Sequence, residues 1–334
     1  KKSMPNKKEE EFYKKISPKL SEVLKLDNND DFCKDYTSKI FSSYEIPNLD
    51  EDLFDEWLEN RLKPNLIFID FKEYLKVAIE ALETYNDIAL TDFGSSRKRD
   101  EAQLWADKIR GYLAEKAFEK KILKDFNIEC KLPHESGHLK DYLDSDIPLI
   151  KKTGDKDFRK SKIKTSIKMT KWSGTWLDLG TQYSHSDIYV QIKVNTGTNH
   201  LMSFLKKIGF FENILLKKGV EMKLISDELK DKLINKIQNF DNLFAYIAGF
   251  KKVNDTNFIH EGELKIGRKW KKYHIKSAEG LLTQKILDDI KNKNNADKIF
   301  INPIEKFTTY PRYIIHNNKL KYKLEDWQEI IDQY

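Results

Sequence analysis

The amino-acid sequence predicts a mixed α/β fold with a central sheet, on three observations. A long helical pattern covers residues 101–126. Apolar and polar residues then alternate in three segments, as they do in strands, at residues 141–150, 163–169 and 186–194. A second helical pattern begins at His200. A helix, three strands and another helix in this order indicate a mixed sheet that is flanked by helices.

The helical and strand-like patterns divide the chain into three regions. Residues 1–95 form a helical N-terminal region, whose clearest amphipathic segment is Phe71–Tyr85. Residues 96–240 contain the predicted sheet and form the central region. Residues 241–334 form a β-rich C-terminal region, in which Asn317 and Asn318 are expected to form a hairpin turn.

Composition excludes several classes of protein. The chain has 334 residues, 39% of them apolar, and no window approaches the roughly 20 apolar residues that a membrane span needs, so no membrane partner is expected. The two cysteines, Cys33 and Cys130, show no metal-ligand spacing, and a reducing cytoplasm is therefore the expected location. No glycine-rich phosphate loop and no HExxH element is present, which argues against an NTPase and a zincin.

Charge is unevenly distributed along the chain, although the net value is only +6. Residues 151–176 carry nine Lys and Arg against two Asp, and residues 251–276 carry eight against three acids. Residues 44–60 carry seven acids and no base. Basic segments of this kind suit a polyanion, because neutralised phosphates release counterions. Solvated surface segments have the same composition.

The basic segments supply candidate DNA contacts. In "GRKWKKYHIK" the bases alternate with Trp270 and Tyr273, which is typical of backbone-binding surfaces, although a hairpin that packs its aromatics inward has the same pattern. The candidates are Arg97, Arg99, Lys171, Gln182, Arg268, Lys269 and Lys271.

The stretch "IKTSIKMT", residues 163–170, carries polar groups on a face of a predicted strand. Counting by twos places Ile167 and Met169 on one face and Ser166 and Lys168 on the other. An edge strand with a solvated basic face would explain the pattern. A strand that presents Ser166 and Lys168 to a reaction site would explain it equally well.

Two carboxylates are candidates for the same site. Asp146 lies on the polar face of the preceding predicted strand. Glu115 lies in an apolar stripe of the long helix, one turn after Gly111, where a carboxylate is costly unless it meets a cation or donors. A surface Glu115 that pairs with Lys116 is the alternative. Two carboxylates and a lysine around a small volume suit phosphodiester hydrolysis with Mg²⁺.

The motifs "GYLAEKAF", "SDI" and "SIKMTKWSGTWLDLGTQYSHSDIYVQIKV" together resemble the core of the PD-(D/E)xK nuclease superfamily, and more narrowly type II restriction endonucleases. The resemblance covers roughly residues 91–216. It implies a restriction-endonuclease-like sheet, Mg²⁺ as cofactor, double-stranded DNA as substrate and a homodimer. It also implies Asp146 and Glu115 as metal ligands, the Ile167 carbonyl as a further ligand, and Lys168 as the residue that positions or activates the attacking water.

The chain departs from the family pattern at two positions. Ser145 replaces the usual proline, and Ser166 occupies the usual acidic position of the (D/E)xK element. Some restriction-enzyme families resemble this chain in having Ser-x-Lys, with the missing carboxylate supplied from a helix. Glu115 is the candidate replacement, which leaves Ser166 as a neutral supporting donor.

A second alignment uses Asp178 with Gln191-x-Lys193, and leaves Glu115 and Asp146 without roles. Under the first alignment Lys193 is expected to be a surface lysine. Two other functions stay open. The chain could be a nucleic-acid-binding protein on a degenerate nuclease scaffold, or a repair or recombination nuclease that recognises DNA structure.

Overall fold

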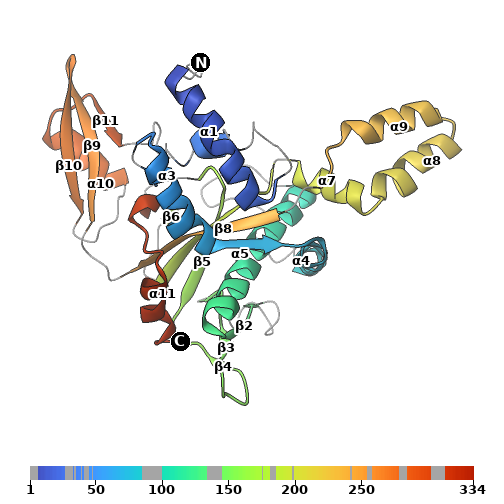
Figure 1. Cartoon of the computed structure of the whole chain (residues 1–334), viewed down its shortest axis with the longest axis horizontal. Helices are drawn as coiled ribbons and strands as arrows, with labels where there is room; N and C mark the ends of the chain where they lie inside the picture. The colour runs from blue at the N-terminus through green and yellow to red at the C-terminus, as the bar shows by residue number, and fades with distance from the viewer. Residues whose placement is uncertain are drawn as a thin grey trace.

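The computed structural model has a mixed α/β body with two units projecting from it (Figure 1). This confirms the predicted fold class at the level of a mixed α/β protein. The structure describes residues 7–26, 33, 35–38, 40, 45–46, 48–84, 100–133, 145–174, 176–180, 186–197, 199–240, 243–253, 258–277, 284–301 and 313–334.

The centre of the body is a sheet of four strands in the order β1, β8, β7, β5. Neighbours are antiparallel except β7 and β5, which are parallel. Two of its strands coincide with the segments predicted at 163–169 and 186–194, whereas β1 comes from the N-terminal region and β8 from the C-terminal region. All three sequence regions therefore contribute to one sheet. The bounds are β1 (Leu66–Ile69), β5 (Thr165–Lys171), β7 (Ile188–Val194) and β8 (Leu243–Lys252).

Helices cover one face of this sheet. Helix α5 coincides with the long helix predicted at 101–126 and packs on β7 through Val190 and Ile192. Asp100 caps it, accepting a hydrogen bond from the Gln103 N–H at 2.8 Å. A small sheet of order β2, β3, β4 follows it. The bounds are α4 (Phe71–Thr84), α5 (Glu101–Phe126), β2 (Glu129–Lys131), β3 (Leu149–Lys151), β4 (Arg159–Lys160) and α11 (Leu324–Ile331).

The other face of the sheet is covered by the N-terminal helices and by a pair of strands, β6 and β12. Tyr189, Phe244 and Tyr246 point to this side and form a second apolar core with the helices. Both faces are therefore buried, as the apolar strands β7 and β8 require. The bounds are α1 (Lys7–Leu24), α3 (Glu51–Trp57), η1 (Leu58–Leu62), η2 (Lys63–Asn65), β6 (Trp176–Gly180) and β12 (Tyr313–His316).

The hairpin turn predicted at Asn317 and Asn318 is wrong. These residues begin a single 3₁₀ turn, η7 (Asn317–Lys319), after which Lys321 pairs with Phe250 of β8. Gly249 permits this approach, because its φ is +136° and a side chain there would lie 2.4 Å from the Lys321 carbonyl oxygen. The chain is thus drawn to the central sheet and does not fold back on β12.

A buried ionic cluster ties the second core together. The Glu45 carboxylate is fully buried and accepts hydrogen bonds from Lys193 Nζ at 2.6 Å, from the Asn317 amide at 2.7 Å and from the Tyr246 hydroxyl at 2.8 Å. Arg61 Nε lies 3.8 Å away. Burial alone would raise the pKa of Glu45, but the charges of Lys193 and Arg61, with the hydrogen bonds from Lys193 and Tyr246, lower it to about 2. The associated stability is therefore complete above about pH 4.5 and is lost as pH falls towards 2.

Two units project from the body in Figure 1. One is a helical arm and the other a three-stranded sheet with a helix. Among the described helices none is both long and apolar enough to cross a bilayer. The arm comprises α7 (His200–Lys207), η6 (Phe211–Leu215), α8 (Leu216–Glu221) and α9 (Asp227–Lys236); the sheet unit comprises β9 (Phe258–Ile266), β10 (Lys269–Ser277), α10 (Gln284–Lys293) and β11 (Lys298–Ile301).

The substitution Glu45→Gln is expected to lower the free energy of unfolding by about 3–5 kcal/mol, because it leaves Lys193 and Arg61 buried without a counter-charge. Glu59→Gln is the matched control. Glu59 pairs with Lys63 at a side-chain exposure of 58%, so its loss should cost less than about 1 kcal/mol. Urea denaturation of the two variants measures the difference, and equal costs would contradict a structural role for the Glu45 cluster.

Candidate functional site

Asp146 lies at the outer edge of β5, in the bend that precedes β3. Its N–H donates to the Thr165 carbonyl at 2.7 Å, and its Oδ2 accepts the Ile167 N–H at 2.5 Å. Ser145 Oγ accepts the Thr165 N–H at 3.1 Å. These three contacts fix the Asp146 carboxylate against the strand that carries Ser166 and Lys168.

The Ile167 carbonyl shares this edge. In a strand, the N–H and C=O of one residue point to the same side, and the Ile167 N–H points to Asp146. On its other side β5 pairs with β7, where Lys168 lies opposite Gln191. A carboxylate and a backbone carbonyl oxygen therefore occupy the same open edge of the central sheet.

Lys168 and Ser166 are half-buried on the face of β5 that adjoins Tyr189. The Lys168 ammonium lies 5.8 Å from the centre of the Tyr189 ring. Burial raises the pKa of the Asp146 carboxyl, while the Ile167 hydrogen bond and the charge of Lys168 oppose that rise. β5 is an edge strand of the four-stranded sheet, and Ser166 and Lys168 on this face are partly covered, whereas Lys164 just before the strand is exposed.

Tyr189 is a member of the cluster that the sequence analysis did not identify. It lies opposite Ser166 in the parallel register of β5 and β7. Burial raises the pKa of its hydroxyl, and the charge of Asp146 adds to that rise. Only the register of the two strands, which an alternating pattern does not give, could have indicated this neighbour.

Glu115 comes from a helix on the other side of the sheet. Helix α5 packs on the face that carries Ile167 and Met169, opposite to the face that carries Lys168. Glu115 would therefore have to reach the Asp146 site around the open edge of β5. Its role as a metal ligand stays a prediction.

The second alignment meets a physical obstacle. Lys193 is buried and bonded to Glu45, so its expected position as a surface lysine is wrong. The Gln191 amide is also buried and donates to the Trp176 carbonyl at 3.0 Å. Asp178 lies on β6, opposite Ile314 of β12. Gln191 and Lys193 are used inside the fold, which favours the alignment through Asp146 and Lys168.

The donor set at β5 fits Mg²⁺ in part. Hard cations prefer carboxylate and carbonyl oxygens, and Asp146 with Ile167 offers one of each. Within the described part of the chain, no three His, Cys, Asp or Glu side chains are grouped so that they could hold a metal ion. A metal at this edge would depend on Asp146, Ile167 and Glu115, or on oxygens of the substrate.

The candidate DNA contacts fall in several places. Arg97, Arg99 and Gln182 lie outside the described residues. Lys171 is exposed at the end of β5. The remaining three candidates lie together on the projecting hairpin of β9 and β10: Arg268, Lys269 and Lys271.

This hairpin projects from the body (Figure 1), and its bases lie in and beside the turn that joins its two strands. Ile266 pairs with Lys269, so Gly267 and Arg268 form a two-residue turn, in which Gly267 takes a φ of +59°. Trp270 is 51% exposed, whereas Tyr273 packs towards α10. In β10 successive side chains alternate between the two faces, so the exposed ring of Trp270 lies on the opposite face from Lys269 and Lys271.

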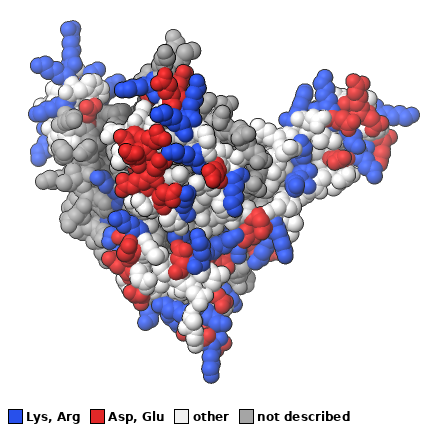
Figure 2. Space-filling model, in the orientation of Figure 1, with Lys and Arg blue, Asp and Glu red and all other residues white. Residues whose placement is uncertain are grey.

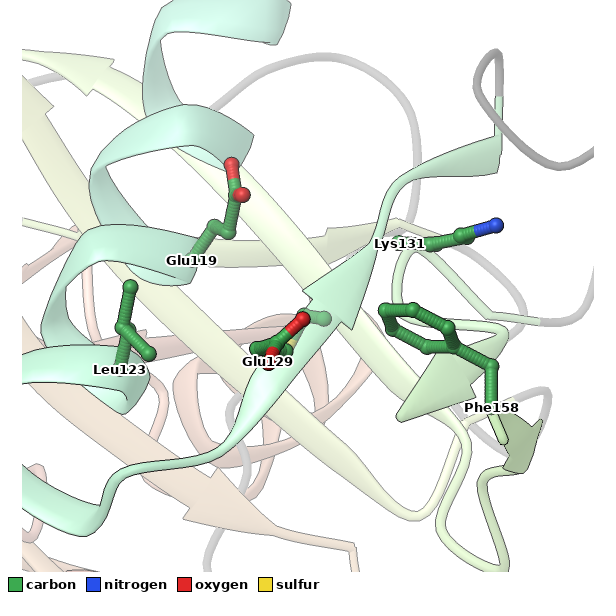
Figure 3. Close-up of a pocket in the computed structure, with 6 residues that line it drawn as sticks. Glu119, Leu123, Glu129, Lys131 and Phe158 are labelled. Carbon is green, nitrogen blue, oxygen red and sulfur yellow. The ribbon is translucent and has the colours of Figure 1, made fainter. Parts of the chain in front are cut away.

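A cavity of about 510 Å³, which Asp146 and Lys168 do not line, lies between α5 and the small sheet of β2, β3 and β4 (Figure 3). Glu119 and Leu123 line it from α5, and Lys131 lines it beside Phe158, with its ammonium 4.6 Å from the ring centre. Burial raises the pKa of the Cys130 thiol in its wall to about 12, so the thiol is unreactive. The cavity offers no catalytic group to the Asp146 site.

Comparison of the whole chain with protein-family models, curated proteins and solved structures finds no match to any of them. A function can therefore be inferred only from the cluster of Asp146, Ser166, Lys168 and Tyr189 and from the charged surfaces around it.

Proposed function

We propose that the protein is a Mg²⁺-dependent endonuclease that cleaves short sequences in double-stranded DNA, as type II restriction enzymes do. The observation that carries this proposal is the hydrogen bond from the Ile167 N–H, between Ser166 and Lys168, to the Asp146 carboxylate at the edge of the central sheet. Asp and Ser-x-Lys are the residues on which the sequence resemblance to PD-(D/E)xK nucleases rests.

Each residue of the cluster has a task in this chemistry. Asp146 is anchored by the Ile167 N–H through Oδ2, and its carboxylate is available to a cation together with the Ile167 carbonyl. Lys168 acts electrostatically on Asp146, and its ammonium would orient the attacking water and offset charge on the phosphate. Ser166 would add a neutral donor. Bound Mg²⁺ supplies a Lewis acid and lowers the pKa of a water.

The hairpin of β9 and β10 is proposed as a DNA-contacting element. Its tip carries Arg268, Lys269 and Lys271, while the exposed ring of Trp270 lies on the opposite face of β10 from the two lysines. Bases on a projecting hairpin tip suit a phosphate backbone. Acidic side chains gather over α3 in Figure 2, and a DNA path across that surface is unfavourable. A homodimer, which we propose as the active form, would read a two-fold symmetric site.

The alternative function is nucleic-acid binding on a degenerate nuclease scaffold. Ser166 favours it, because the usual acidic position is neutral and the helix of Glu115 lies across the sheet. Incubation with several unmodified phage DNAs, with Mg²⁺ or with EDTA, separates the two. Discrete Mg²⁺-dependent fragments support a sequence-specific nuclease, whereas intact DNA that shifts in a gel supports a binding protein. Cleavage of branched or flapped DNA alone would support a repair nuclease.

Lys168→Ala is expected to reduce cleavage at least about 100-fold while leaving DNA binding within a few-fold, because a positioned charge acts mainly on the transition state. Lys162→Ala is the matched control, since Lys162 is exposed near the start of the same strand. Gel assays of cleavage and of binding in Ca²⁺ measure both quantities. Equal losses in the two variants would contradict a catalytic role for Lys168.

Asp146→Asn is expected to abolish cleavage and yet leave the melting temperature unchanged or higher at pH 8. A carboxyl whose pKa burial raises costs stability when it is ionised, and this cost disappears with a neutral amide that can still accept the Ile167 N–H. Calorimetry and the cleavage assay measure the two effects. A clear loss of stability would indicate that Asp146 is a structural residue.

Glu115→Gln tests the relocated carboxylate. If Glu115 is a metal ligand, the variant should lose cleavage and require a higher Mg²⁺ concentration for any residual activity. Glu119→Gln, one turn further along α5, is the control, because Glu119 pairs with Lys116 at 2.7 Å. Near-normal cleavage by the Glu115 variant would remove this residue from the site.

Alanine at Arg268, Lys269 and Lys271 together is expected to weaken DNA binding and to reduce the salt slope by up to about 3, since each phosphate contact contributes about one unit. The control is alanine at Lys8, Lys14 and Lys15 of α1, which removes the same charge. Titrations at several salt concentrations give both slopes. An unchanged slope would exclude the hairpin tip as a phosphate contact.

A further inference from the structure

The helical arm of residues 200–240 extends away from the body (Figure 1). Its two outer helices, α8 and α9, bury none of their residues. They have 6 and 10 residues, and helices of that length are marginal in water without tertiary packing. The rest of the chain therefore stabilises the outer part of the arm only a little, and a surface that covered the arm would stabilise it further.

The arm also exposes large apolar side chains. Leu224 at the turn between α8 and α9 is 72% exposed, which is more than any other large apolar residue of the described chain. Seven of the fourteen large apolar side chains that are exposed in the described part of the chain lie on this arm, and a concentration of exposed apolar side chains favours an interaction site. The exposed apolar residues of the arm are Met202, Ile208, Ile214, Leu215, Met222, Leu224 and Leu229.

Charge is polarised along the arm. The outer end carries four acids and two lysines, which are Glu221, Asp227, Glu228 and Asp231 with Lys223 and Lys230. The inner end carries one acid and six lysines, which are Glu212 with Lys206, Lys207, Lys217, Lys218, Lys232 and Lys236. In Figure 2 acidic side chains gather on the outer half of the arm, among basic ones. The two ends thus have opposite net charge.

We infer that the arm is a dimerisation element whose partner is the arm of a second copy of this chain. When two identical arms pack antiparallel about a two-fold axis, the acidic end of each lies against the basic end of the other. The same packing covers the exposed apolar residues of both arms. This inference names the interface of the proposed homodimer, and it rests on the arm and not on the nuclease activity.

Helix α9 alone shows the separation of acidic and basic residues along the arm. Its first turn holds Asp227 and Glu228 after the cap Ser226, which accepts the Leu229 N–H at 3.2 Å, and its second half holds Lys232 and Lys236. Two antiparallel copies would place each acidic pair beside a basic pair. DNA would not complement the acidic end, and an acidic protein would complement only the basic end.

Sedimentation analysis of the full chain without DNA tests the inference. The wild-type protein should form dimers whose dissociation constant rises with salt. The base-reversed variant Lys232→Glu/Lys236→Glu and the tip-reversed variant Asp227→Lys/Glu228→Lys should each dissociate on the order of tenfold more readily. Reversal of Lys8 and Lys14 on α1 to Glu controls for the net charge of the base-reversed variant and should leave the dimer unchanged.

Mixing the two reversed variants gives the decisive test. Each opposes itself in a two-fold pair, but together they restore both acidic–basic contacts, so the mixture should form heterodimers at concentrations where neither variant dimerises. Helix content by circular dichroism shows that both remain folded. The weakest self-association that would be useful has a dissociation constant on the order of 100 µM. A wild-type protein that is monomeric at that concentration, or a mixture that stays monomeric, would overturn the inference. DNA cleavage is assayed separately, so its absence would not bear on the arm.

Discussion

The buried carboxylate of Glu45 constrains the whole body of the protein. An ionised group away from water is tolerated only when cations and donors surround it, and Glu45 draws these from three distant parts of the chain: Arg61, Lys193 and Asn317. Since Lys193 lies on β7, the cluster sets where that strand sits beneath the N-terminal helices. β5 pairs with β7, so the strand that carries Lys168 is placed by the same constraint.

Much of the local structure could be predicted from the sequence, because it depends on periodicity. The helical period of apolar residues predicted α4 and α5, and the alternation of apolar and polar residues predicted β5 and β7. These periods need only neighbouring residues, and neighbouring residues are what a sequence displays. The strand predicted at 141–150 is wrong for Asp146, which lies in a bend before β3. The contact of Asp146 with Ile167 joins residues 21 positions apart, and it was expected only from the family resemblance.

What could not be predicted depends on distant partners. From the sequence, Lys193 is expected at the surface, because its buried partner Glu45 is 148 positions away along the chain. The membership of β1 and β8 in one sheet depends on pairing between the two outer regions of the chain. Glu115 illustrates a third difficulty, because a helical pattern shows which side of α5 is apolar but not which face of the sheet it will cover.

The contact between Arg61 and Asn317 affects how the protein can fold during its synthesis. The guanidinium donates to the Asn317 carbonyl at 2.8 Å, and the two residues are 256 positions apart. Contacts of such separation form late and slowly, because a long loop must close first. The four strands of the central sheet are complete at Lys252, but β12 and α11, which help to cover its two faces, follow only after residue 312. During synthesis the apolar faces of these strands therefore stay partly exposed until the last residues have left the ribosome, and we expect chaperones to bind the nascent chain in that interval.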